Sequence, residues 1–345
     1  MYWRLFRLIV GAFTVLVLLS ALFPQETSKP KAENARTVTI YGALPPENLF
    51  IIAQEFEKTT GIKVFYVSLL QQDILPRLRA ERYSPQADVW VGGSLEYLLE
   101  AKKEDLLFSY NSTQMENISP AWRDKEGYWT GLFIDIPVFI TNKDLLLREL
   151  AELPYSWEDM QKPANKSKVA LADPGVSSAN YSMMAAQYQR LGPEKAFDYY
   201  KKLHQNVQQY PKEALTPGRM VSMGEKNTGI LGVNDAVRYI RDGFPIVITF
   251  SKENIGYNLF GTGIVAGAPH GEEARFFMDW LLSKEGQTLL LSKGIYYYPT
   301  NSEVAPTPEV AFFGDLDYGK FNVVEAAENK AKLIEKWNLD VRIGK

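Results

Sequence analysis

The stretch TVTIYGALPPENLFIIAQEFEKTTGIKVFYVSL (residues 37–69) contains the strand–helix–strand pattern that decides the fold. Its first six residues are a β-rich run that ends in Gly42, and apolar residues then recur at helical spacing from Leu49 to Phe56. Gly61 ends the helical pattern, and a second β-rich run follows. This order predicts two strands joined by a helix, as in a parallel α/β sheet.

The same pattern continues along the chain and places two glycine loops in register. A helix is predicted over residues 73–82, a strand over 87–93 (ADVWVGG), and a further helix with Ser94 as its N-cap. In such sheets ligands bind at the loops that follow the carboxyl ends of the strands. Each loop could instead merely permit a tight turn, but two in register favour ligand contacts by Gly42, Ala43, Gly93 and Ser94.

A long β-rich run without helical period, GYWTGLFIDIPVFITN (residues 127–142), is suited to a segment that crosses between two lobes. The strand–helix pattern restarts after it. The predicted strands and helices of this second part are, in order, 167–175, 177–192, the helix EKAFDYYKKLHQN, 228–233, 235–243, 245–250, the returning segment 257–269, and helical segments over 272–292 and 321–337.

A second lobe inserted into the first is the simplest account of this order. We expect an α/β protein with mixed, mostly parallel sheets and a hinge: residues 37–136 and 257–345 form lobe 1, and residues 137–256 form lobe 2. A length of 345 residues suits two lobes better than one core.

Composition excludes several classes of function. A formal net charge of −3 gives no field that would recruit nucleic acid. Cysteine is absent, which excludes disulfides, thiolate metal sites, a cysteine nucleophile and a lipidated cysteine. With only two histidines, a histidine-rich zinc site or a histidine-based triad is hard to build. We therefore expect no cofactor.

The N-terminus indicates export. Two arginines precede an almost wholly apolar run of about 16 residues, from Leu8 to Phe23, which is short of the roughly 20 that span a bilayer. Residues 1–23 are thus predicted to be a signal peptide, followed by a polar linker over 24–36. The cleavage pattern around Ala21 is poor, so an uncleaved membrane anchor is the alternative. Both place the folded body in the periplasm or outside the cell.

The ordered motifs resemble the bacterial solute-binding proteins related to ferric-iron-binding protein, which have the type II periplasmic binding protein fold. The resemblance runs from Thr37 to about Lys332 and rests on IYGA, FEKTTGIKV, ADVWVGG, GLFIDIPVFITNKD, VALADPGVSSANY, TPGRMVSMGEKNTGILGVNDA, SKENIGYNLFGTGIVAGAPHGEEARFFMDWLLSKEGQ and YPTN. It implies two lobes that close over a ligand and deliver it to the membrane permease of an ABC importer. We expect a monomer.

The resemblance also implies which residues contact the ligand. Ser177 and Ser178 begin a helix, where their hydroxyls either cap it or bind ligand oxygens. The family places a ligand-contacting loop at Thr216 and Arg219, and an arginine there either pairs with a phosphate or carboxylate or simply faces solvent.

Two further pairs follow from the same resemblance. Asn234 and Asp235 begin a helix, and Asp235 is explained equally well as a first-turn carboxylate. Glu253 and Asn258 lie in the segment where the family has an acidic loop that lines the cleft. Asp135, within GLFIDIPVFITNKD, completes the predicted set.

The resemblance argues against iron. Ferric binders of the family carry adjacent tyrosines near the position of Asn234 and Asp235, whose phenolates suit Fe(III). The cluster Tyr296, Tyr297 and Tyr298 precedes Pro299, where packing is the expected role. The predicted ligand is therefore a small organic anion, phosphorylated, phosphonate-like or a carboxylate, and ferric iron is the alternative. Because acidic residues repel a bare phosphate, a ligand that also carries hydroxyls or an amine fits better.

Two other functions compete with transport. A hydrolase with paired carboxylates would need a nucleophile elbow, a phosphate loop or a metal cluster, and the sequence contains none of these patterns, so we expect no enzyme. A periplasmic sensor module for a membrane kinase would use the same fold and cleft, and the sequence does not separate it from a transport protein.

Overall fold

The computed structural model describes residues 36–253, 256–312 and 320–343. The predicted signal peptide (1–23) and nearly all of the predicted linker (24–36) lie outside the described residues. Residues from Thr37 onward form one compact unit. No helix among the described residues is long and apolar enough to cross a membrane.

Within the part of the chain that the structure describes, the first sheet has seven strands, and the segment 37–69 opens it as predicted. β1 and β2 pair in parallel on either side of α2, and β1 also pairs in parallel with β3. α2 ends where Gly61 adopts a left-handed backbone (φ +73°) and donates its N–H to Glu57 O at 2.9 Å. The strands of this sheet are β1 (Thr37–Gly42), β2 (Lys63–Ser68), β3 (Val89–Ser94), β4 (Leu107–Phe108), β5 (Thr130–Asp135), β10 (Asn258–Val265) and β11 (Tyr298–Pro299).

The chain leaves this sheet at Ile136 and enters a second one. The predicted crossing segment forms β5 in the first sheet and β6 in the second, and the chain returns to the first sheet with β10. The strands of the second sheet are β6 (Pro137–Asn142), β7 (Val169–Ala170), β8 (Thr228–Gly232) and β9 (Ile246–Thr249).

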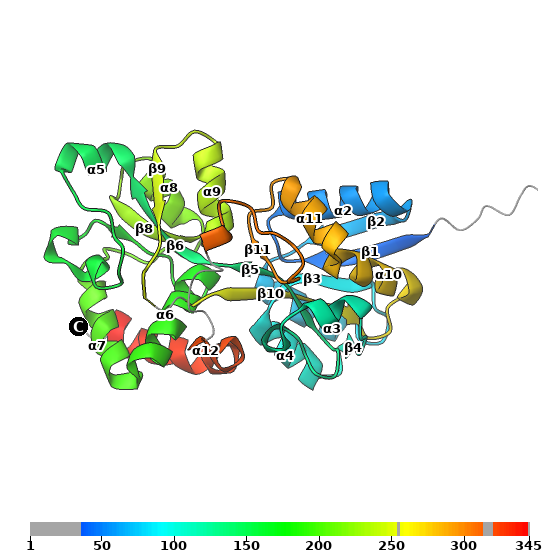
Figure 1. Cartoon of the computed structure of the whole chain (residues 1–345). Helices are drawn as coiled ribbons and strands as arrows, with labels where there is room; N and C mark the ends of the chain where they lie inside the picture. The colour runs from blue at the N-terminus through cyan, green and yellow to red at the C-terminus, as the bar shows by residue number, and fades with distance from the viewer. Residues whose placement is uncertain (1–35, 254–255, 313–319, 344–345) are drawn as a thin grey trace, which may run out of the picture. The chain divides into compact units, whose positions relative to one another are not determined.

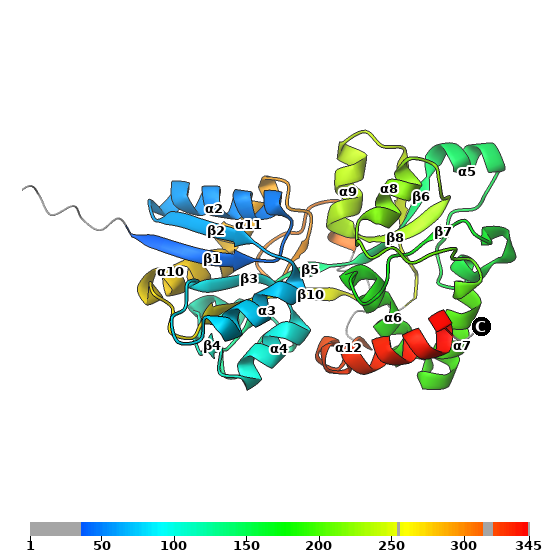
Figure 2. The same ribbon diagram turned by 180° about the vertical axis from the view of Figure 1, so that it is seen from behind.

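Each sheet has its own helices, which Figures 1 and 2 show from opposite sides. Around the first sheet lie α2 (Pro46–Thr60), α3 (Gln71–Ala80), α4 (Leu95–Lys103), α10 (Gly271–Leu282) and α11 (Lys284–Ser292). Around the second lie α5 (Lys143–Glu149), α6 (Ser178–Leu191), α7 (Pro193–His204), α8 (Thr216–Ser222) and α9 (Val233–Arg241).

The last helix, α12 (Val323–Trp337), contacts helices of both groups, α4 and α6. Lys330 of α12 pairs with Glu96 of α4 at 2.5 Å, and Tyr181 of α6 donates its hydroxyl proton to Ala326 O at 2.5 Å. The predicted lobe boundaries remain a proposal, since α12 falls within the range assigned to lobe 1 and packs on α6.

The predicted α/β fold with two lobes and mixed sheets is confirmed, but "mostly parallel" is wrong. Among the strand pairs of the described residues, only β1–β2, β1–β3 and β7–β8 are parallel, whereas β10 runs antiparallel to β3, β4 and β5, and β6 runs antiparallel to β8 and β9. For β5 and β10 the reason is that β5 leads the chain out of the first sheet and β10 brings it back beside β5, so the two strands run in opposite directions.

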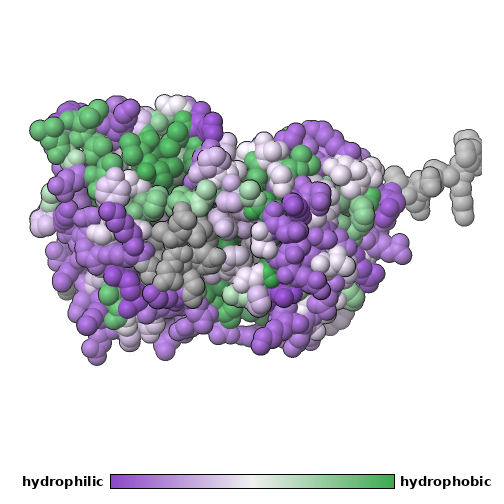
Figure 3. Space-filling model, viewed as in Figure 1, coloured by the Kyte–Doolittle hydropathy of each residue, from purple (hydrophilic) through white to green (hydrophobic). Residues whose placement is uncertain are grey.

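Apolar side chains are exposed around α5. Figure 3 shows apolar surface gathered where Figure 1 places this helix. Leu147 is 66% exposed and Leu150 is 90% exposed, and Leu150 holds a left-handed backbone (φ +48°) that is unusual for a bulky side chain. Patches of this kind are typical of contact sites.

Candidate functional site

The two predicted glycine loops lie at the same edge of the first sheet. Gly42 is in register with Val91 of the parallel strand β3, and Ala43 donates its N–H to Val91 O at 3.0 Å. Gln71, which sequence reasoning missed, links the loops. Its Nε2 donates to Gly92 O at 2.9 Å and to Ala43 O at 3.3 Å, while its Oε1 accepts the N–H of Ser94 at 2.9 Å.

These contacts give the loop residues structural roles. Gly92 has a left-handed backbone (φ +77°), which explains the glycine. A Cβ at Gly93 would lie 2.8 Å from the Trp90 ring. Ser94 is buried at the N-cap position of α4 as predicted, yet its hydroxyl makes no capping hydrogen bond. The amide of Ser94 already has Gln71 as its partner, so a ligand would have to displace that side chain.

Four predicted residues come together where the chain crosses between the sheets. Asp135 ends β5 and is directly opposite Asn258 at the start of β10. Asn234 and Asp235 lie in the first turn of α9, where the fully buried Asn234 donates its Nδ2–H to Asp235 Oδ1 at 3.2 Å and accepts the N–H of Tyr296 at 3.1 Å. The charge of Asp235 acts directly on the carboxyl of Asp135.

Two atoms of this group are buried without a hydrogen-bond partner among the described residues: Asp135 Oδ1 and Asn258 Nδ2. Asp135 Oδ1 is a hydrogen-bond acceptor, or a donor if the acid is protonated, and Asn258 Nδ2 is a donor. Because buried polar atoms are normally paired, unpaired ones facing each other across a strand pair indicate a place for a polar partner.

Burial dominates the titration of both carboxyls. It raises the pKa of Asp135 well above its usual value, and the charge of Asp235 raises it further, against the lowering effect of the backbone amides of Asn234 and Val233. Burial likewise raises the pKa of Asp235 to about 6, although Asn234 and Arg238 lower it. Asp135 therefore gives up its proton at a higher pH than an ordinary aspartate does, and Asp235 titrates near pH 6.

Gly232 makes room for Asp135. A Cβ at position 232 would lie 2.0 Å from Asp135 Oδ2. Any side chain there would displace the carboxyl, so the glycine before α9 is a requirement of this site.

Sequence reasoning missed three residues of the same group: Arg238 of α9, and Glu47 and Asn48 in the first turn of α2. Arg238 donates its Nη1–H to Glu47 Oε1 and its Nη2–H to Asn48 Oδ1. Arg238 Nε and Asn48 Nδ2 are buried without a hydrogen-bond partner among the described residues. The signal that could have found Arg238 is its spacing, three and four residues after Asp235 and Asn234 on one helix face.

We call this group the Arg238 cluster. Its members share the region between α2, α9 and the β5–β10 pair: Glu47, Asn48, Asp135, Asn234, Asp235, Arg238 and Asn258. The guanidinium and the amides supply donors for an anion, and the carboxyls supply partners for hydroxyl or ammonium groups. The cluster therefore offers hydrogen-bonding partners to a small ligand that carries both kinds of group.

Four other predicted residues lie on α6 and α8. Ser177 is buried and caps α6, its Oγ accepting the N–H of Asn180 at 3.3 Å, which is the capping alternative. Ser178 is the first residue of α6 and is partly buried. Thr216 donates its hydroxyl proton to Glu213 at 3.2 Å. Arg219 is exposed on α8. Burial and the charge of Asp235 raise the pKa of Tyr239, and the charge of Arg219 lowers it.

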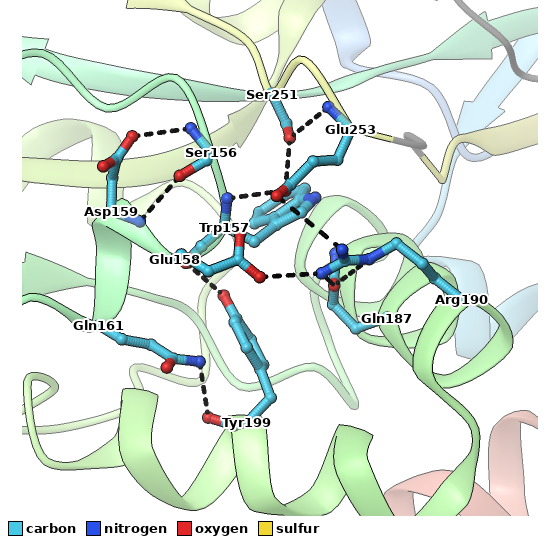
Figure 4. Close-up of polar contacts among 10 residues, drawn as sticks. All are labelled: Ser156, Trp157, Glu158, Asp159, Gln161, Gln187, Arg190, Tyr199, Ser251 and Glu253. Atoms are coloured by element: carbon cyan, nitrogen blue, oxygen red, sulfur yellow. Dashed lines mark hydrogen bonds and ion pairs between the residues drawn. The ribbon is translucent and has the colours of Figure 1, made fainter.

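Glu253 belongs to a different polar network, which Figure 4 shows. Its Oε2 accepts the N–H of Trp157 at 3.0 Å and the hydroxyl of Ser251 at 3.1 Å, and Arg190 of α6 lies 3.9 Å from its Oε1.

Glu158, which pairs with Arg190 at 3.2 Å, also interacts with Glu253. Burial and then Glu158 raise the pKa of Glu253, and the hydrogen bond from Glu253 lowers the pKa of Glu158. As the pH falls, Glu253 therefore takes up a proton before Glu158 does. The network ties the segment after β9 to α6, and within the described residues none of these contacts involves another predicted site residue.

The tyrosines near Pro299 pack as predicted. Tyr297 is fully buried between Phe133 and Phe260, with ring centroids 5.7 and 5.3 Å away, and burial raises the pKa of its phenol. A phenol held protonated is a poor ligand for Fe(III). Within the described residues, no three histidine or acidic side chains are grouped so that they could hold a metal ion.

Two cavities lie away from the Arg238 cluster. One of about 660 Å³ lies beside α5 and is lined by residues such as Leu146, Pro154 and Lys168. A groove of about 450 Å³ lies between α4 and α12 and includes Gly175, two residues before Ser177. None of the residues predicted to contact the ligand lines either cavity.

Comparison with known proteins identifies related molecules. Residues 52–315 match the family model described as bacterial extracellular solute-binding protein. Among solved structures, the periplasmic binding protein AfuA from Actinobacillus pleuropneumoniae, with exogenous fructose-6-phosphate bound, is similar with a TM-score of 0.79 and 30% identity, over 89% of this chain and 99% of that chain.

Two curated relatives are named for different ligands. A putative 2-aminoethylphosphonate-binding periplasmic protein from Salmonella typhimurium is 29% identical over 317 residues, covering 85% of this chain and 87% of that protein. An Fe(3+)-binding periplasmic protein from Serratia marcescens is 24% identical over 338 residues, covering 95% of this chain and 97% of that protein.

Proposed function

Because this chain belongs to the family of bacterial extracellular solute-binding proteins and is the solute-binding component of an ABC importer, we propose that it captures a small phosphorylated or phosphonate-bearing organic anion. We further propose that the ligand carries hydroxyl or ammonium groups beside its anionic end.

The observation that carries this proposal is the Arg238 cluster. Arg238 Nε and Asn48 Nδ2 are buried donors without a hydrogen-bond partner among the described residues, and both lie at the first turn of α2. A guanidinium at the positive end of a helix favours a phosphoryl or phosphonate group. The anionic end of the ligand is therefore assigned to Arg238 and Asn48.

The carboxyls supply the second half of the proposal. Asp135 and Asp235 have raised pKa values, and the amide nitrogen of Asn258 has no hydrogen-bond partner among the described residues. The carboxyls, where ionised, repel a bare phosphate and attract hydroxyl or ammonium groups, while the amide of Asn258 can donate to a ligand oxygen. Fructose-6-phosphate and 2-aminoethylphosphonate, the compounds named for two relatives, both combine an anionic end with such groups.

Ferric iron is the weaker candidate. The Serratia relative is named for Fe(3+). Asn234 and Asp235 stand here where the ferric binders that the sequence resembles carry tyrosines, and Tyr297 is buried with a raised phenol pKa. These features support an organic ligand.

The test is a titration of the purified protein by calorimetry with fructose-6-phosphate, 2-aminoethylphosphonate and ferric citrate. We expect binding of one of the organic anions. Arg238→Ala should weaken that binding at least 100-fold, since charge-assisted bidentate contacts of this kind contribute roughly 3 kcal/mol or more.

The sequence-predicted Arg219 provides the matched comparison, because it is an exposed arginine on the neighbouring helix α8. Arg219→Ala should change the dissociation constant less than threefold. Binding of ferric citrate alone would refute the ligand class, and a loss of binding in Arg219→Ala with full retention in Arg238→Ala would move the anionic end to α8.

The family and the N-terminal segment support a proposal for the compartment and the partner of the protein. We propose that residues 1–23 export the chain, that the folded body works in the periplasm or outside the cell, and that a membrane permease receives the ligand. We also propose reversible capture by a monomer without chemical turnover, and no role in nucleic-acid binding. A sensor module for a membrane kinase would bind the same ligand, and loss of uptake on deletion of the permease separates the two roles.

A further inference from the structure

The carboxylate of Glu47 is held by the same guanidinium that we assign to the ligand. Arg238 donates to Glu47 Oε1 through Nη1 and to Asn48 Oδ1 through Nη2. Glu47 also lies in the first turn of α2, where the helix dipole favours a negative charge. A carboxylate in this position has the charge and the hydrogen-bond partners that a phosphoryl or phosphonate group would have.

The side chains around Arg238 differ in how easily they can move away from its guanidinium. The side chain of Glu47 is 52% exposed, whereas that of Arg238 is 22% exposed. Asp235 is held by the fully buried Asn234, and Asn48 is fully buried. Glu47 can therefore turn into solvent, where water replaces its hydrogen bonds at little cost, while Arg238 and Asn48 stay in place.

The geometry points to Glu47 as an internal competitor of the ligand, whose carboxylate must leave Arg238 before the anionic group of the ligand can pair with it. This inference rests on the proposed function. It makes Glu47 a residue that sets affinity and selects for ligands able to displace a carboxylate, because a neutral sugar gains nothing from the exchange.

The direct test is Glu47→Gln, titrated by calorimetry with fructose-6-phosphate and 2-aminoethylphosphonate. Removing the competing charge should tighten the binding of whichever compound the wild-type protein binds, by about 3- to 10-fold, the range expected for releasing a half-exposed ion pair. Unchanged or weaker binding would overturn the inference, because Glu47 would then be neutral or a supporting contact.

Glu47→Asp separates direct competition from net charge. The shorter side chain keeps the charge but retreats from Arg238, so direct competition requires tighter binding in this variant too. Tightening in Glu47→Gln alone would instead reflect net charge and would overturn the inference.

Glu309→Gln is the matched control. Glu309 pairs at 2.5 Å with Arg241, one turn further along α9, and lies outside the Arg238 cluster. This variant should bind like the wild type, and a tightening equal to that of Glu47→Gln would overturn the inference. The wild-type titration keeps the two ideas separate: absence of organic-anion binding refutes the proposed function, whereas binding that Glu47→Gln fails to tighten refutes only the competition.

Discussion

Replacing Asp235 with asparagine should stabilise the protein in a pH-dependent manner. The carboxyl of Asp235 lies in the first turn of α9, accepts a hydrogen bond from Asn234 at 3.2 Å, and has a pKa raised by burial to about 6. Asparagine has nearly the same shape but cannot ionise. The change therefore isolates the free-energy cost of holding a carboxylate at this place.

The magnitude follows from the pKa. In the unfolded chain the carboxyl has its ordinary pKa of 3.8, so folding raises it by about two units, from 3.8 to about 6. Between these values the folded protein binds more protons than the unfolded chain, and its stability falls as the pH rises. At about 1.4 kcal/mol per unit, the wild-type protein loses about 3 kcal/mol between pH 4 and pH 7 that Asp235→Asn keeps.

The measurement is urea denaturation of both proteins at several pH values between 4 and 8. The stability difference should grow from pH 4 through pH 5 and 6 and level off above pH 7. Asp242→Asn, at the exposed C-cap of the same helix, is the control and should show no comparable growth. A difference that is constant across the range would refute the assignment of a strained, buried charge to Asp235.

Two further predictions concern stability. Gly232→Ala should destabilise the protein by roughly 1–3 kcal/mol in the same denaturation assay, because its Cβ would lie 2.0 Å from Asp135 Oδ2. Gly271→Ala, whose Cβ would have nothing within 4 Å, is the control and should be neutral. Equal effects of the two variants would show that Asp135 moves aside freely. Lys330→Met should destabilise the protein by about 1–3 kcal/mol, because it leaves Glu96 without its ion-pair partner where both side chains are under 20% exposed. Lys168→Met removes a more exposed ion pair with Glu149 and should cost under about 1 kcal/mol. The reverse order of the two effects would contradict a stabilising role for the ion pair between α4 and α12.

Local sequence pattern was sufficient for most of the fold. The strand predicted over 37–42 and the helix end at Gly61 both stand in the structure, because a β-branched run, a 3.6-residue apolar period and a left-handed C′ glycine each act over a few residues. Strand direction was harder to predict. Whether β5 has a parallel or an antiparallel neighbour depends on its pairing with β10, more than 100 residues later, so no local period in the sequence reports it.

The candidate site divides in the same way. Asp135, Asn234, Asp235 and Asn258 were predicted, and they lie together because strand ends and helix starts converge there. Arg238 and Glu47 are 191 residues apart in sequence, and each reads locally as an ordinary solvent-facing charge on an amphipathic helix. Only the packing of α9 against the first turn of α2 makes them partners, so the sequence could at most point to Arg238 by its spacing from Asp235 and could not reveal its pairing with Glu47.

The position of the Arg238 cluster gives ligand binding a mechanical consequence. Glu47 and Asn48 belong to a helix of the first sheet, Arg238 and Asp235 to a helix of the second, and Asp135 directly precedes the residue at which the chain changes sheets. A ligand shifts a conformational equilibrium only as far as its contacts differ between states. A ligand held jointly by Arg238 and the α2 end makes both sets of contacts only when the two helices are together. It therefore favours the arrangement that the Glu47–Arg238 pair already stabilises. Competition with Glu47 and closure of the lobes therefore both depend on contacts made by the guanidinium of Arg238.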